Sequence, residues 1–305
     1  MVKLHNFPSR AEWLAARRLG LGGSDIPAIL GISPYSTPLQ VWSSKVGLDE
    51  EREESYVLRR GSHMEPLLWR ELAAEVPGLR AVPQSMTIVE GDEPWMRYSP
   101  DAFLAIETPG SYVEALGEGK SHPRGASDWD DGVPPHVVAQ VQWGMHVCGM
   151  DLAFVAVDLG TEFKWARVDR DPDWWPTHEE TIRAFWRAVE TETPPAPTGD
   201  EGDTSALARM FPREEPGKIM SLPGAMISLA EAWDAAAAAE KAAAAERERI
   251  GNMIRSEMKD SERAVFPDGS GFTWRVQERV KRIADPSGEK TVSRVLLRAK
   301  ARKER

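Results

Sequence analysis

Three residues in two strand-like segments have the types and spacing needed to bind a metal and act on a phosphate. Asp101 follows Pro100, and beyond a turn-rich stretch Glu118 and Lys120 stand two residues apart. Two carboxylates that converge at strand ends can hold Mg²⁺, which takes one or two protein carboxylates together with water and substrate phosphate. Residues two apart in a strand share a face, so Lys120 would lie beside Glu118, where it could stabilise a phosphate or orient a water. A solvated hairpin has the same pattern.

Three other segments favour chemistry over the hairpin. In RRLGLGGSD, Arg18 ends one predicted helix and Ser24 stands near a glycine-rich helix start. Guanidinium, hydroxyl and backbone N–H donors in this arrangement suit a terminal phosphate. In GSHMEPLL, Glu65 lies on a predicted helix, and in AQVQWGM another predicted helix carries Gln140 and Gln142.

The elements that must position these residues follow from the hydrophobic periodicity. The pattern first has the helical period, then alternates as strands do, then returns to helices separated by a hairpin. Helices are predicted over residues 9–18, 24–31, 58–75, 134–148 and 177–191, with a further helix after a turn within 33–47, and strands within 84–92, 95–107, 113–121 and 151–168. This order predicts a layered α/β (α+β) domain that ends near Thr193.

Composition changes after that domain. Residues 193–204 are rich in proline, glycine and acids, as linkers are. Residues 225–259 are alanine-rich and favour a long helix, and FPDGSGFTWRV favours a β-hairpin with a tight turn. We therefore predict a core over residues 1–195, a linker over 196–223, and over 224–305 an alanine-rich helical region with a β-hairpin and a basic C-terminal tail.

Charge and composition limit the function classes. The 305 residues carry a formal net charge of −10, which argues against a surface that binds polyanions everywhere but not against a local groove. Charge is uneven: residues 272–305 carry +7, which leaves −17 on the first 271. A single cysteine, Cys148, excludes an internal disulfide. With no long apolar run and no signal-like N-terminus, we expect a cytoplasmic protein without a membrane span.

The motifs occur in an order typical of one family. RLGLGGSD with LGISPYSTPLQVW comes first, then Gly61 to Glu65 as G-x-x-x-E, then SPDAF with EGK, and last AQVQWGM. Residues 1–190 thereby resemble the YqaJ-type phage recombination exonucleases, whose best-known relative is the lambda exonuclease, within the PD-(D/E)xK nuclease superfamily. The resemblance implies a nuclease core with a central mixed sheet flanked by helices.

The resemblance also implies an activity and partners. Such a protein would be a Mg²⁺-dependent 5′-to-3′ exonuclease that acts on double-stranded DNA ends and leaves 3′ single-stranded tails for homologous recombination by strand annealing. It would use two Mg²⁺ ions, with Mn²⁺ able to substitute. Its partners would be duplex DNA ends, a phage single-strand annealing protein and further copies of itself in a closed ring. It would be phage-encoded and act in the cytoplasm of the bacterial host.

Residue roles follow by motif. Asp101, Glu118 and the backbone carbonyl of Gly119 would be metal ligands, Lys120 would position the nucleophilic water, and Glu65 would lie near the second metal or its waters.

The remaining motif positions would contact DNA. Gln140 would touch the water or the scissile phosphate, with Gln142 as its neighbour, and Arg18 and Ser24 would bind the 5′ phosphate.

One departure from the family pattern leaves alternatives open. Family members usually have an apolar residue between the Glu and the Lys, whereas this chain has Gly119, preceded by Gly117. Glycine weakens a strand, so the backbone either bends there to serve the metal or is loose, with low activity. The alternatives are a structure-specific or restriction-type endonuclease on the same core, and a DNA-end-binding protein with weakened catalysis. A pocket for a terminal phosphate at Arg18 and Ser24 favours the exonuclease.

Overall fold

The computed structural model describes residues 2–48, 56–123, 125–280 and 290–299, in two compact units, Met1–Glu215 and Pro216–Arg305. The boundary differs from the one predicted at residue 195. The predicted linker contains a helix, α7 (Glu201–Met210), which packs against α3 (Pro38–Lys45) of the first unit. Proline and acidic residues obscured α7 in the sequence, because its buried side chains are the small Ala206 and the charged Asp203, which give no apolar stripe.

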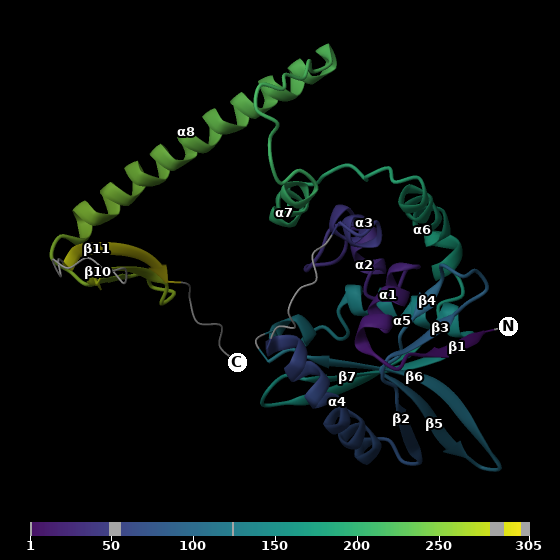
Figure 1. Cartoon of the computed structure of the whole chain (residues 1–305). Helices are drawn as coiled ribbons and strands as arrows, with labels where there is room; N and C mark the ends of the chain where they lie inside the picture. The colour runs from purple at the N-terminus through teal and green to yellow at the C-terminus, as the bar shows by residue number, and fades with distance from the viewer. Residues whose placement is uncertain (1, 49–55, 124, 281–289, 300–305) are drawn as a thin grey trace. The chain divides into compact units, whose positions relative to one another are not determined.

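The first unit follows the predicted order of helices, strands, helix, hairpin and helix (Figure 1). Its other helices are α1 (Arg10–Arg18), α2 (Ile26–Ile29), α4 (Tyr56–Glu75), α5 (Pro135–Cys148) and α6 (Trp174–Glu190), with a 3-10 turn, η1 (Ala126–Trp129). Its strands are β1 (Lys3–Asn6), β2 (Leu79–Pro83), β3 (Thr87–Glu90), β4 (Arg97–Tyr98), β5 (Ala102–Thr108), β6 (Ser111–Ser121), β7 (Leu152–Asp158) and β8 (Phe163–Asp169).

The main sheet has the order β2-β5-β6-β7-β8. Strands β6 and β7 run parallel and the other neighbours run antiparallel, so the sheet is mixed. β6 is the central strand, and Glu118 and Lys120 lie opposite Val155 and Val157 of β7. The predicted fold, a central mixed sheet flanked by helices, is confirmed.

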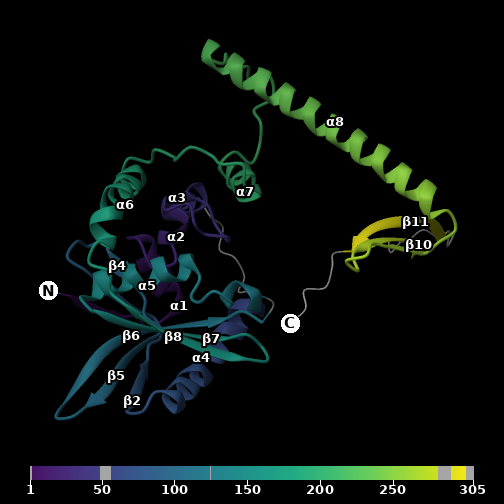
Figure 2. The same cartoon turned by 180° about the vertical axis from the view of Figure 1, so that it is seen from behind.

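Two helical layers cover this sheet, as the two opposite views show (Figures 1 and 2). Helix α4 packs on one face through Leu68, Trp69 and Leu72. Helix α5 packs on the other face and is covered in turn by α2 and α6. Because strand residues alternate between faces, neighbouring residues of β6 contribute to different cores: Ala115 joins the α4 side and Leu116 the α5 side.

A second, smaller sheet explains why one predicted strand is divided. Residues 95–107 were predicted as a single strand, but β4 pairs with β3 in a three-stranded sheet of order β1-β3-β4, whereas β5 belongs to the main sheet. Pro100 lies between them and has no N–H to donate to a ladder. Asp101 therefore occupies the junction between the two sheets.

The second unit is built around one long helix. After a 3-10 turn, η2 (Gly224–Met226), α8 (Ile227–Met258) confirms the alanine-rich helix, and β9 (Arg263–Val265) and β10 (Gly271–Val280) confirm the hairpin. β10 also pairs with β11 (Lys290–Ala299), within the segment predicted as a basic tail. Residues 281–289 and 300–305 of that segment lie outside the described residues. In the part of the chain that is described, no helix has both the length and the hydropathy of a membrane span.

Candidate active site

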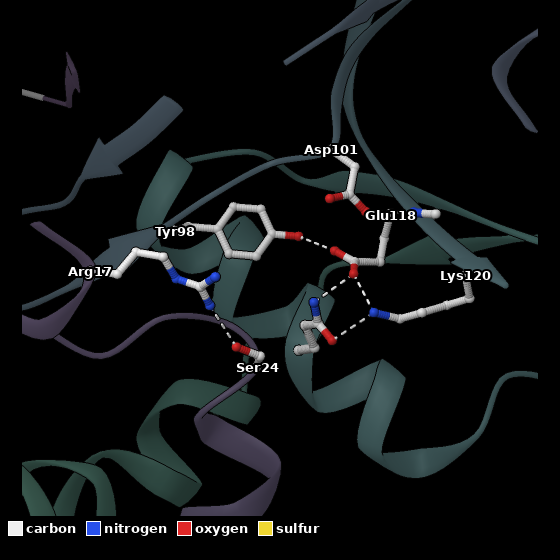
Figure 3. Close-up of polar contacts among 8 residues, drawn as sticks. Arg17, Ser24, Tyr98, Asp101, Glu118 and Lys120 are labelled. Atoms are coloured by element: carbon white, nitrogen blue, oxygen red, sulfur yellow. Dashed lines mark hydrogen bonds and ion pairs between the residues drawn. The ribbon is translucent and has the colours of Figure 1, made fainter. Parts of the chain in front are cut away.

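The carboxylate of Glu118 is the point at which the predicted catalytic residues meet (Figure 3). Glu118 is 2% exposed. Its Oε1 accepts hydrogen bonds from Lys120 Nζ and from Gln140 Nε2, each at 2.5 Å, and its Oε2 accepts one from the Tyr98 hydroxyl at 2.7 Å. Lys120 lies two residues on in β6, Gln140 comes from α5, and Tyr98 comes from β4. Three elements distant in sequence therefore converge on one buried carboxylate.

Asp101 and Glu65 add negative charge beside Glu118. The Gly119 N–H donates to Asp101 Oδ2 at 2.8 Å, which ties the junction after β4 to the central strand. Burial, and then the charge of Glu118, raise the pKa of Asp101 well above its ordinary value. Burial and Glu118 likewise raise the pKa of Glu65, on α4. The three carboxylates, which we call the carboxylate cluster, therefore repel one another.

The carboxylate cluster fits a hard divalent cation. Its ligands are oxygens, the type that Mg²⁺ prefers, and a bound cation would relieve the repulsion that raises these pKa values. Within the described residues, no three His, Cys, Asp or Glu side chains are grouped closely enough to hold a metal by themselves. Asp101 and Glu118 are the residues that would hold the metal, with the Gly119 backbone between them.

Lys120 stays charged in this site. Burial alone would lower its pKa, but the negative charges of Glu118 and Asp101 and the hydrogen bond to Glu118 outweigh burial and raise it. Its ammonium also donates to Gln140 Oε1 at 3.0 Å. At neutral pH Lys120 is therefore a fixed positive charge beside the carboxylates and not a proton acceptor.

Tyr98 is a site residue that the motifs did not identify. Its ring lies so close to Gly23 and Gly144 that a Cβ on either glycine would come within 2.7 Å of it. Burial, and then the charge of Glu118, raise the pKa of the Tyr98 hydroxyl well above its ordinary value, so this hydroxyl remains a donor to Glu118. The alternating buried residues before SPDAF, Met96 and Tyr98, were the available signal.

At the predicted phosphate site, a different arginine contacts Ser24. Arg17, not Arg18, donates to Ser24 Oγ, at 2.9 Å, and its guanidinium lies over the ring of Trp13, 4.7 Å from the centroid. Arg18 is exposed and faces the same cleft. Arg17 and Arg18 are adjacent on the helix, so their side chains point about 100° apart. The sequence RR alone does not show which of the two faces Ser24.

One cleft joins the phosphate site to the catalytic residues. It has a volume of about 1050 Å³ and is lined by Arg17, Arg18 and Ser24 as well as by Lys120 and Gln140. Figure 3 shows the Arg17–Ser24 pair and the Glu118 network together. A strand end held at Ser24 would therefore share a cavity with the Lys120 ammonium.

Gln142 does not lie in the site, which corrects its predicted contact with DNA. It is 4% exposed; its Nε2 donates to the Asp169 carbonyl at 2.9 Å and its Oε1 accepts from the Asp171 N–H at 3.0 Å. Positions two apart on a helix point about 200° apart, so Gln142 and Gln140 cannot share a face. Gln142 instead ties α5 to the connection between β8 and α6.

The two glycines of β6 leave the strand intact. Gly117 and Gly119 face α4, where a Cβ would lie 3.0 Å from the Trp69 ring at Gly117 and 3.1 Å from Leu68 at Gly119. The ladder to β7 continues through both positions without a break. Close packing of α4 on the sheet therefore accounts for the glycines, and the β6–β7 ladder is uninterrupted there.

A mixed sheet that carries an aspartate, a Glu-x-Lys pair and a glutamine from the adjoining helix is the architecture expected from the resemblance. Residues 12–151 match the family model of the YqaJ-like viral recombinase domain. The resemblance to the YqaJ type is therefore confirmed, and all the motif residues named above lie within the matched range.

Individual proteins show the same likeness. The chain is 25% identical over 268 residues to the protein YqaJ of Bacillus subtilis (strain 168), covering 83% of this chain and 80% of that protein. Among solved structures, an alkaline exonuclease from Laribacter hongkongensis, LHK-Exo, is similar with a TM-score of 0.48 and 18% identity, covering 66% of this chain and all of that one. A structure of LHK-Exo in complex with dAMP gives the same values.

Proposed function

We propose that this protein is a Mg²⁺-dependent exonuclease that degrades double-stranded DNA from its 5′ ends and leaves 3′ single-stranded tails. The observation that carries the proposal is the shared cleft. Arg17 and Ser24 would bind a terminal phosphate there, and Lys120 and Gln140, which also line the cleft, contact the carboxylate cluster. The match to a viral recombinase domain supports a role for these tails in homologous recombination by strand annealing.

Two groups of side chains would have different roles: one would bind the 5′ end of the DNA strand, and the other would position the groups that act on the phosphodiester. Arg17 and the exposed Ser24 hydroxyl would bind the 5′ phosphate, and the Gly23 backbone, packed on Tyr98 and Gln140, would fix that loop against the catalytic residues. Tyr98 and Gln140 hold the Glu118 carboxylate. When bound, Mg²⁺ would stabilise the attacking and leaving oxygens of the phosphodiester.

Lys120 would complete the site. As a permanent cation with donors to both Glu118 and Gln140, it can orient a water and offset charge on the scissile phosphate. The alternative of a DNA-end-binding protein with weakened catalysis was suggested by Gly117 and Gly119. Because close packing of α4 accounts for both glycines, they no longer support that alternative. The annealing partner, the closed ring, the substitution of Mn²⁺ and the cytoplasmic location stay predictions.

The test is digestion of linear duplex DNA that carries a 5′ phosphate, with each strand labelled in turn. The proposal expects loss of the 5′ strand alone in Mg²⁺, none in EDTA, none with Lys120→Ala, and no cutting of closed circular DNA. Cutting of circles would replace the exonuclease by the endonuclease, and loss of the 3′ strand first would overturn the polarity.

A further inference from the structure

Helix α7 brings a cation into the cleft from outside the matched family domain. Arg209, on α7, lines the same cleft as Arg17, Arg18 and Ser24, although the family match ends at residue 151. Figures 1 and 2 both place α7 beside α3, the helix that contributes the cleft residues Gln40, Val41 and Ser44. The segment that reads as a linker in the sequence therefore forms part of the cleft wall.

A buried charge anchors this helix. Asp203, near the start of α7, is 1% exposed, and its carboxylate accepts hydrogen bonds from the Thr37 hydroxyl, from the Thr198 N–H and, at 2.7 Å, from the Thr198 hydroxyl. Burial alone would raise the pKa of Asp203, but these hydrogen bonds outweigh burial and lower it. Asp203 is thus a fully satisfied carboxylate that joins α7 to a residue 166 positions earlier.

The anchor holds α7 to the start of α3. Thr37 is the N-cap of α3, and its Oγ1 also accepts the Gln40 N–H, at 3.2 Å. A Cβ at Gly202 would lie 2.5 Å from Gln40 Oε1, so the two helices touch there. Ala206 is fully buried, and Arg209 comes one turn later, beside that buried stripe. The anchor therefore sets the rotation of α7 that turns Arg209 toward the cleft.

The cleft is basic although the chain is acidic. Six lysines and arginines line it against two aspartates, whereas the whole chain has a net charge of −10. The cations are Arg10, Arg17, Arg18, Lys45, Lys120 and Arg209. Asp25 is neutralised by Lys45 at 2.6 Å, so it offers little repulsion to an anion. A phosphate chain entering the cleft meets a local excess of positive charge, to which Arg209 contributes from the α7 side.

We propose that α7 is a DNA-binding element of this protein, in which Arg209 contacts a phosphate of the DNA backbone and Asp203 is the positioning residue that holds Arg209 in place. The inference rests on the proposed function only in taking DNA as the ligand. Arg17 and Ser24 bind the strand terminus, and Arg209 binds the sugar-phosphate backbone whatever the chemistry of the terminus.

The test measures binding apart from catalysis, by fluorescence anisotropy in EDTA with linear duplexes that end in a 5′ phosphate or a 5′ hydroxyl. Arg209→Ala should weaken binding about threefold to tenfold at ~0.1 M salt, equally for both duplexes. The plot of log affinity against log salt should become shallower by about 0.9, the value for one phosphate contact. Arg213→Ala is the matched control, because Arg213 is exposed just beyond α7 and does not line the cleft.

The anchor is tested by a double-mutant cycle. Asp203→Asn should reproduce the loss caused by Arg209→Ala, and the double variant should lose no more than either single variant. If Asp203→Asn does not fold, Thr198→Val replaces it, since it removes one hydrogen bond to Asp203 and should give part of the same loss. Additive losses would overturn the positioning role of Asp203.

The outcomes separate the two proposals. Wild-type protein that neither binds nor digests duplex DNA would overturn the proposed function. Wild-type protein that binds and digests DNA, with Arg209→Ala indistinguishable from Arg213→Ala in affinity and salt dependence, would overturn the α7 inference and leave the exonuclease standing.

Discussion

The carboxylate cluster and the predicted phosphate site are built in opposite ways, although one cleft connects them: Lys120, which contacts Glu118, lines the same cleft as Arg17 and Ser24. Glu118 is buried in the central strand and has hydrogen-bond donors on both carboxylate oxygens, whereas Ser24 is exposed on a glycine-rich loop with a single partner, Arg17. The first arrangement is rigid and fixed by the sheet. The second leaves a hydroxyl and a guanidinium open to solvent, as a site for an incoming ligand must be.

The electrostatics of the two regions are also opposite. Around Glu118, burial and then the negative charge of Glu118 raise the pKa values of Asp101 and Glu65, so a positive charge there would be favourable. Around Ser24, Arg17 and Arg18 face the cleft, and the neighbouring carboxylate of Asp25 is already paired with Lys45. One region thus favours a cation and the other an anion, which is what a metal-dependent enzyme acting on a terminal phosphate requires.

The largest effect should come from removing the Lys120 ammonium that contacts the carboxylate cluster. Lys120→Ala deletes the donor to Glu118 and Gln140, and we expect cleavage to fall by at least about 10²- to 10³-fold, the range for loss of a positioned charged donor. Single-turnover digestion in Mg²⁺ measures it. Binding of 5′-phosphorylated duplex in EDTA should change far less, because Arg17 and Ser24 remain.

Lys120→Met serves as the control, since it keeps the length and packing of the side chain without its charge. Equal losses in the Ala and Met variants would assign the effect to the charge. Retention of near-wild-type cleavage by Lys120→Met would contradict the catalytic role and reduce Lys120 to a packing residue.

The next effect concerns the phosphate site and decides between two neighbouring arginines. Arg17→Ala removes the partner of Ser24, and we expect the preference for 5′-phosphate over 5′-hydroxyl ends to fall about 10- to 100-fold, as for loss of a charge-assisted hydrogen bond. Arg18→Ala is the matched variant one residue away. Competition binding with the two kinds of end measures both; a larger loss with Arg18→Ala would restore the role predicted from the motif.

Patterns among residues close in sequence were enough to predict strand β6, helix α5 and the start of helix α1. Glu118 and Lys120 share a face because strands alternate, and Gln140 belongs to a helix whose start and end were readable at Pro135 and Gly149. The Ser9 cap of α1 was readable for the same reason: its hydroxyl accepts the Glu12 N–H three residues on. In each case the deciding contact is between residues close in sequence.

Contacts between distant segments could not be read in this way. Tyr98 reaches Glu118 only because the chain changes sheets at Pro100, and Asp203 reaches Thr37 across 166 residues. The choice of Arg17 over Arg18, and the outward turn of Gln142, depend on the rotation of a helix, which tertiary packing sets. Periodicity gives the elements, but it does not give the partner of a polar side chain.

A smaller effect is expected for the glycines beneath the carboxylate cluster. Gly117→Ala would place a Cβ 3.0 Å from the Trp69 ring, and overpacking of this kind costs about 1–3 kcal/mol of the free energy of unfolding. Thermal or urea unfolding measures it, and Trp69→Leu in the same chain should recover part of the loss. Alanine at Gly110, where no atom lies within 4 Å of the Cβ position but φ is +78°, separates backbone strain from packing.

The smallest effect tests the electrostatic half of the comparison. The folded-state pKa of Asp101 lies above its ordinary value, so the fold favours the protonated form. The stability from this preference is full below pH ~3.8 and is lost as pH rises through the folded pKa. Above pH ~3.8, without metal, the Asp101 carboxyl therefore costs the fold stability. Asp101→Asn cannot ionise and keeps an acceptor for the Gly119 N–H, so at neutral pH it should raise Tm in EDTA by roughly 2–4 °C.

The advantage of Asp101→Asn should shrink toward acid pH, where the wild-type carboxyl is itself protonated. Mg²⁺ should raise the Tm of the wild type more than that of the variant, because only the wild type has a charge for the cation to relieve. Scanning calorimetry from pH 4 to pH 8, with and without Mg²⁺, checks both expectations. If Asp101→Asn were less stable than the wild type at pH 8 in EDTA, the carboxylates would not be repelling one another. The contrast between the carboxylate cluster and the predicted phosphate site would then lie in their exposure alone.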